Sequence, residues 1–131
     1  MFDLRLVLAL GFVAAIALVA QPAAIAHENL NKTMYVTFSG KVQLPGVTLD
    51  GGTYIFELAD PTSAWDIVRV MSRRRDHVYF QGFTQRIERP AGLRRDQVVS
   101  FGEAPKGVPP PIAVWYPRDE STGRQFIYRT R

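Results

Sequence analysis

The sequence predicts an all-β domain, an antiparallel β-sandwich or a small barrel of seven or eight short strands, preceded by a signal peptide. Three observations predict this class. Apolar and polar residues alternate with a period of two along the chain after residue 26, and turn-forming residues interrupt this alternation every 8–15 residues. No long stretch carries the helical period of 3.6, which argues against a parallel α/β fold, because parallel strands need crossover helices.

Residues 1–26 have the pattern of a secretory signal peptide. A short start containing Arg5 precedes an uncharged apolar run over residues 6–20, and residues 24–26 place alanine at the −3 and −1 positions of a cleavage site. The run is about 15 residues long, shorter than the roughly 20 that a membrane-spanning helix needs. We therefore expect cleavage before His27, leaving a single secreted or periplasmic domain over residues 27–131 that is not transmembrane.

The first expected strands lie before and after a Pro-Gly turn at residues 45–46, which suits the middle of a type II turn. Residues 33–38 place three apolar side chains on one face, those of Met34, Val36 and Phe38. Residues 42–44 form a short strand, and residues 53–58 follow another tight turn at 50–52. In this third strand we expect Glu57 to point outward while its apolar partners, Tyr54, Phe56 and Leu58, point inward.

The remaining strands form two hairpin-like pairs and one isolated segment. Residues 65–71 and 78–83 make a hairpin around an arginine-rich turn at 72–76, with Val78 and Phe80 on one stripe. The other stripe of the second strand holds Tyr79, Gln81 and Phe83. A loose segment at residues 88–96 leads to a strand at 98–102, and prolines occupy 109–111. Residues 112–116 and 124–129 form the last pair.

Part of this pattern resembles a known family. The stretch from Val36 to Leu58, and within it VQLPGVTLDGGTYIFEL from Val42 onward, is similar to small exported bacterial β-proteins marked by VxLPGxxLPAGTYxFxL. The chain departs from that pattern at residues 50–51, where Asp-Gly stands in place of Pro-Ala. The family's C-terminal GxxFxY strand matches Gly123, Phe126 and Tyr128. The resemblance implies an exported β-protein and carries no catalytic residues over to this chain.

Arginine is concentrated in one part of the domain. The segment from Arg69 to Arg95 holds eight arginines and two acidic residues, so its charge is +6 while the rest of residues 27–131 carries −2. Guanidinium groups bind phosphate or carboxylate in a bidentate manner, which predicts an anionic envelope partner such as lipid head groups, lipopolysaccharide, an acidic polysaccharide or an acidic protein. The residues expected to bind it are Arg73, Arg74 and Arg75 in the turn and Arg94 and Arg95 farther on.

The alternative interpretation of these arginines is a solubilising surface in a chain with 13 arginines and three lysines. Nucleic acid is not expected as a partner, because export removes the chain from cellular DNA and RNA. No cysteine is present, which excludes disulfide scaffolds, zinc–thiolate and iron–sulfur sites, thiol nucleophiles and a cysteine lipid anchor.

No metal site or cofactor is expected, with one alternative based on the two histidines. Cleavage before His27 would give a mature N-terminus whose amine and ring nitrogen, together with the ring of His77, can form a histidine brace for copper. No nucleophile elbow or other catalytic motif is visible, so we expect a non-enzymatic binding or scaffold domain at the cell envelope. A small-ligand carrier with a β-barrel cavity is the second alternative.

Overall fold

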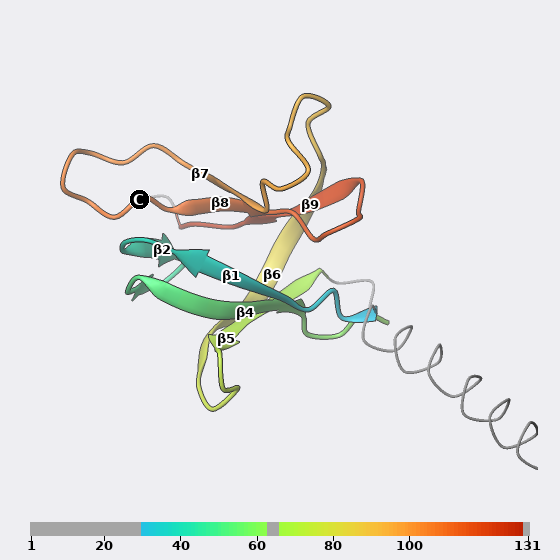
Figure 1. Ribbon diagram of the computed structural model, residues 1–131, viewed down its shortest axis with the longest axis horizontal. Helices are drawn as coiled ribbons and strands as arrows, with labels where there is room; N and C mark the ends of the chain where they lie inside the picture. The colour runs from blue at the N-terminus through green and yellow to red at the C-terminus, as the bar shows by residue number, and fades with distance from the viewer. Residues whose placement is uncertain (1–29, 63–65, 130–131) are drawn as a thin grey trace, which may run out of the picture. The chain divides into compact units, whose positions relative to one another are not determined.

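The computed structural model describes residues 30–62 and 66–129 (Figure 1). The chain divides into two units, Met1–Leu30 and Asn31–Arg131, and the described part of the second unit is all-β, which confirms the predicted fold class. The signal peptide and His27 lie outside the described residues, as does the start of the strand expected at 65–71. Across the described ranges, no helix is both long and apolar enough to cross a membrane.

The described residues form nine strands in two sheets. The strands are β1 (Met34–Phe38), β2 (Val42–Leu44), β3 (Val47–Leu49), β4 (Gly52–Leu58), β5 (Ile67–Ser72), β6 (Val78–Glu88), β7 (Val99–Phe101), β8 (Ile112–Trp115) and β9 (Thr122–Phe126). Seven of them make one sheet in the order β1-β4-β5-β6-β9-β8-β7, and β2 pairs with β3. Every pairing between these strands is antiparallel.

The long strand β6 joins the two halves of the large sheet (Figure 1). Its first part pairs with β5, ending at Ile67↔Phe83, and its second part pairs with β9, beginning at Thr84↔Phe126. The sheet therefore curls through β6, so that β1, β4 and β5 face β7, β8 and β9 across the core. The prediction left a sandwich and a barrel open, and the structure is a curled antiparallel sheet that is open along one side.

Apolar side chains from both halves of the sheet fill the space between them. The period-two alternation of β1 is confirmed, since its first, third and fifth residues are buried. The core cluster includes Met34, Val36, Phe38, Tyr54, Phe56, Leu58, Val68, Val70, Ile112, Trp115 and Phe126. Phe56 and Trp115 are completely buried and their ring centroids lie 6.0 Å apart, so the aromatic residues at the centre belong to the core.

The β2–β3 hairpin packs against one end of this core. It encloses the Pro-Gly turn, and Gly46 has the positive φ of 77° that the third position of a type II turn requires. The strand β3 was not predicted, because its three residues lie between two turn signals. The backbone N–H of Gln43 donates to the Pro110 carbonyl at 2.9 Å, which ties the hairpin to the segment before β8.

Tyr128 fastens the same end of the molecule. Its hydroxyl oxygen lies 2.7 Å from the carbonyl of Ile112 and 3.1 Å from the carbonyl of Gln43. Burial raises the pKa of Tyr128 to about 12. The tyrosine of the GxxFxY stretch therefore joins the C-terminal segment to β2 and β8.

One expectation about side-chain faces was incomplete and another was wrong. Glu57 does lie on the face opposite Phe56, but it is 1% exposed, because arginine side chains cover it. The alternation expected in β6 is broken by a bulge, since Val70 pairs with Phe80 while Met71 pairs with Val78. The residue between them, Tyr79, packs against the core together with Phe80, although the period of two had placed them on opposite stripes.

Candidate functional site

The arginine-rich turn between β5 and β6 is closed by hydrogen bonds centred on Ser72. The N–H of Arg75 donates to the Ser72 carbonyl at 2.9 Å, and the Ser72 hydroxyl donates to Asp76 Oδ1 at 2.6 Å. The same hydroxyl oxygen accepts the backbone N–H groups of Asp76 and His77, each at 3.1 Å. These bonds fix the backbone of the loop, so the two residues in the middle of the turn are held at its tip.

The side chain of Arg75 has different contacts from those of Arg73 and Arg74. Its backbone is left-handed, with φ of 63°, and its side chain folds back along the sheet. There Nη1 donates to Glu57 Oε1 at 2.9 Å, while Arg69 Nη2 donates to Glu57 Oε2 at 2.6 Å. Each carboxylate oxygen of Glu57 is thus bound by one guanidinium, and Thr33 Oγ1 lies 3.3 Å from Oε1. Glu57 therefore pairs with both guanidinium groups, although its single charge offsets only one of theirs.

Arg73 and Arg74 are the exposed cations at the tip of the turn. Within residues 30–62 and 66–129, neither side chain has an ion-pair partner. The only acid within the turn itself is Asp76, whose carboxylate is bound by Ser72. The turn therefore presents two adjacent guanidinium groups to solvent on a fixed backbone.

Arg94 and Arg95 lie beyond the opposite end of β6, in the loop before β7 (Figure 1). The 11 residues of β6 separate this loop from the arginine turn, a length of about 35 Å at the usual rise of a strand. Arg94 Nε lies 3.5 Å from Asp96 Oδ1, and both side chains are exposed. The five arginines predicted to bind one partner therefore do not form one surface.

Arg89 organises the loop that carries Arg94 and Arg95. Its Nη2 donates to the carbonyl of Arg94 at 2.6 Å and to that of Gln97 at 3.2 Å. Its guanidinium also lies over the ring of Tyr116, 5.1 Å from the centroid. This arginine acts within the fold, like Arg75.

A second charge cluster, which sequence reasoning missed, lies between β5, β6 and β9. Arg124 is 2% exposed, and its Nε lies 3.1 Å from Asp66 Oδ1 while Nη1 lies 3.2 Å from Glu120 Oε2. Arg86 Nη2 donates to the same Asp66 oxygen at 2.8 Å, and this hydrogen bond raises the pKa of Arg86. The only sequence signal was an arginine at a core-facing position of a strand. The charges neutralise one another, which makes the cluster structural.

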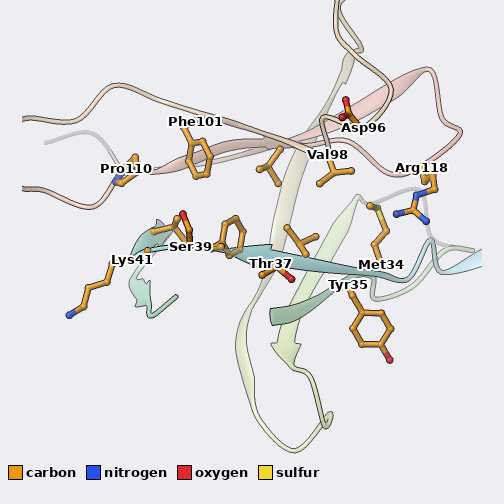
Figure 2. A pocket seen from close by; sticks show the side chains of 15 residues that line it. Met34, Tyr35, Thr37, Ser39, Lys41, Asp96, Val98, Phe101, Pro110 and Arg118 are labelled. Atoms are coloured by element: carbon orange, nitrogen blue, oxygen red, sulfur yellow. The ribbon is translucent and has the colours of Figure 1, made fainter. Parts of the chain in front are cut away.

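A cleft of about 550 Å³ lies between the edge strands β1 and β7 (Figure 2). Figure 2 shows Met34 and Arg118 at one end of it and Phe101 and Pro110 at the other. The side chain of Tyr35 points away from the cleft, on the outer face of β1. The apolar lining comes from Met34, Val36, Phe38, Val98, Val99 and Phe101. Sequence reasoning missed this cleft, because it depends on which strands lie at the edges.

The copper and carrier alternatives remain predictions. His77 is exposed, and its ring packs against that of Tyr79 with centroids 4.4 Å apart. Among the described residues, no group of three or more His, Asp or Glu is arranged to hold a metal ion. Phe56, Ile112 and Trp115 fill the middle of the core, and the cleft at the sheet edge is a space that a carried ligand could use.

Comparison with family models, with curated proteins and with solved structures found no match for this chain.

Proposed function

We propose that this protein is a non-enzymatic binding domain, exported to the cell envelope, that contacts an anionic surface through Arg73 and Arg74. The observation that carries the proposal is the difference between these two residues and the neighbouring arginines. Arg69 and Arg75 are both ion-paired with Glu57, whereas the tip residues have no ion-pair partner in the described part of the chain. The signal-peptide pattern of residues 1–26 supports the location.

A fixed turn suits this role. The hydrogen bonds to Ser72 hold the backbone in place, so binding an anion costs the side-chain freedom of two arginines and little loop ordering. Each guanidinium can bind a phosphate or carboxylate group through two parallel hydrogen bonds. A basic residue near an anionic membrane contributes about 1 kcal/mol, so the pair contributes about 2 kcal/mol, roughly 30-fold in affinity. Such a contact is weak and sensitive to salt.

Sedimentation with lipid vesicles tests the proposal. The exported protein should bind vesicles containing anionic phospholipid at about 0.05 M salt and dissociate by about 0.5 M, because the Debye length falls from over 10 Å to below 5 Å. Replacing Arg73 and Arg74 together with glutamine should weaken binding roughly 10- to 30-fold, while the melting temperature stays unchanged.

The matched control replaces Arg94 and Arg95 with glutamine, which removes the same charge from the other end of β6. This variant should lose less than about threefold in affinity. An equal loss in both variants would show that binding follows net charge. Binding that persists at high salt would show that the contact is not electrostatic. Either result refutes the role of the arginine turn.

A further inference from the structure

The large sheet ends in two strands that have no partner on their outer side. Among the described residues, β1 and β7 are the first and last strands of the seven-stranded sheet. They line opposite sides of the cleft of about 550 Å³ shown in Figure 2. Edge strands carry backbone N–H and C=O groups that are free to pair with another chain. The cleft is therefore bordered by two such edges at once.

The number of strands explains why these two edges do not form an antiparallel pair with each other. Six successive antiparallel pairings connect β1 to β7, so these two strands run in the same direction. Figure 2 agrees, since both Met34 to Ser39 and Val98 to Phe101 run away from the Arg118 end. Direct closure would need a parallel ladder. One additional strand between them would instead be antiparallel to both and would complete an even-numbered sheet.

The hydrogen bonds of β7 show which of its backbone groups face the cleft. The N–H of Tyr116 donates to the Val98 carbonyl at 2.7 Å, and the N–H of Gly102 donates to the Pro111 carbonyl at 2.8 Å. In an antiparallel ladder the residues that bond to the partner alternate with residues that point away from it. Val99 and Phe101 therefore direct their backbone N–H and C=O groups away from β8, toward the open side. There the Val99 carbonyl accepts a long hydrogen bond of 3.4 Å from Gln97 Nε2, which an added strand would replace.

The cleft is closed at one end, where Lys41 pairs with Asp50 at 3.8 Å, and carries an unpaired cation at the other. At the closed end Gln43 forms a parallel bridge with Pro111, and the rings of Phe38 and Phe101 lie 6.3 Å apart. At the opposite end Arg118 is exposed and has no ion-pair partner within residues 30–62 and 66–129. Asp96, which also lies at that end, pairs with Arg94 at 3.5 Å.

We infer that the cleft between β1 and β7 binds an extended peptide segment of a partner protein as an eighth strand, antiparallel to both edges. The segment runs from the Phe101 end toward the Arg118 end, so its C-terminal end meets the unpaired guanidinium. Its chemistry follows from the walls: alternate apolar residues face Val36 and Val99, and an acidic residue or terminal carboxylate follows them. This site is separate from the arginine turn and does not depend on the proposed function.

A synthetic peptide tests the inference. The probe is a seven-residue peptide of alternating valine and threonine that ends in glutamate with a free carboxylate, and its binding is measured by calorimetry and by amide hydrogen exchange. We expect the amides of Val99 and Phe101, and alternate amides of β1, to become protected. The same peptide with N-methylated backbone amides should not bind, because it cannot pair with the edges. Equal binding of the N-methylated peptide, or no change in protection on β1 and β7, would overturn the inference.

A charge exchange tests the direction of the segment. Arg118→Glu should weaken binding of the glutamate-ended peptide about three- to fivefold and strengthen binding of a version ending in lysine amide by a similar factor. Lys106→Glu makes the same change of charge at an exposed residue that does not line the cleft, and it should alter neither affinity. If Arg118→Glu leaves the affinity for both peptides unchanged, the segment does not run in the inferred direction, which would overturn the inference. Concentration-dependent dimerisation that protects β1 without peptide would identify a second copy of the chain as the occupant and would also overturn the inference.

Discussion

Replacing Glu57 with glutamine should destabilise the fold strongly, although the sequence gives this residue the outward position of a strand. The substitution preserves shape and removes the negative charge that binds Arg69 Nη2 at 2.6 Å and Arg75 Nη1 at 2.9 Å. Breaking a buried ion pair by removing one partner costs about 3–5 kcal/mol. Here the cost is reduced, because the Arg69 and Arg75 side chains retain 26% and 49% exposure and are able to recover hydration.

We therefore expect Glu57→Gln to lower the free energy of unfolding by about 2–3 kcal/mol. For a domain of this size the melting temperature should fall by about 10–20 °C. Urea unfolding followed by circular dichroism measures the change directly. Arg75→Gln should lose about 1 kcal/mol, since half of that side chain stays hydrated, and Arg74→Gln should lose less than 0.5 kcal/mol.

Arg74→Gln and Arg75→Gln form a matched pair, because the same substitution is made at neighbouring positions of one turn. If the free energy of unfolding of Glu57→Gln is within 0.5 kcal/mol of that of the unmodified protein, the ion pairs of Glu57 with Arg69 and Arg75 do not stabilise the fold. Equal losses for Arg74→Gln and Arg75→Gln would show that the turn does not divide its arginines into one ion-paired residue and two unpaired residues. Either result would remove the basis for choosing the tip residues as the binding site.

Three further predictions concern packing and titration. Gly123→Ala should destabilise the fold by about 1–3 kcal/mol, because the new Cβ would lie 2.7 Å from the Tyr116 ring. Gly92→Ala, whose new Cβ would have nothing within 4 Å, should change the free energy of unfolding by less than 0.5 kcal/mol. Urea unfolding compares the two variants, and equal effects would exclude the clash. Phe56→Ala should cost about 3–5 kcal/mol in the same assay, and a loss below 1 kcal/mol would show that this side chain is not in the core. The pKa of Tyr128 is raised to about 12, so its contribution to stability is complete below about pH 10 and is lost as the pH rises toward 12. Absorbance at 295 nm should show one fewer late-ionising tyrosine in Tyr128→Phe than in the unmodified protein. An unchanged titration would contradict the burial of Tyr128.

Periodicity predicted the parts of the fold that depend on local patterns. The alternation in β1 places its apolar residues in the core, and the Pro-Gly turn has a positive φ at Gly46. The bulge at Tyr79 was not predictable from alternation, because a bulge inserts one residue into a strand whose sequence still alternates. Strand β3 was missed because its three residues resemble a connection between turns.

The site required information that a single strand does not contain. Three consecutive arginines look equivalent in the sequence, and only the fold brings Glu57 beneath one of them. Linear proximity also suggested that Arg73 and Arg95 share a basic surface, whereas β6 places them at opposite ends of the sheet. The open edge between β1 and β7 depends on the order of all seven strands, which pairwise hairpin signals do not determine.

The most direct test of the anion-binding claim is an NMR titration of the arginine side chains with inorganic tripolyphosphate at low salt. The Nε–H signals of Arg73 and Arg74 should shift together and return when the salt concentration reaches about 0.5 M, because the contact is electrostatic. The signals of Arg69 and Arg75, which are bound to Glu57, should move little. Larger shifts at Arg94 and Arg95 than at the tip of the turn, or no shift at either arginine pair, would contradict the account.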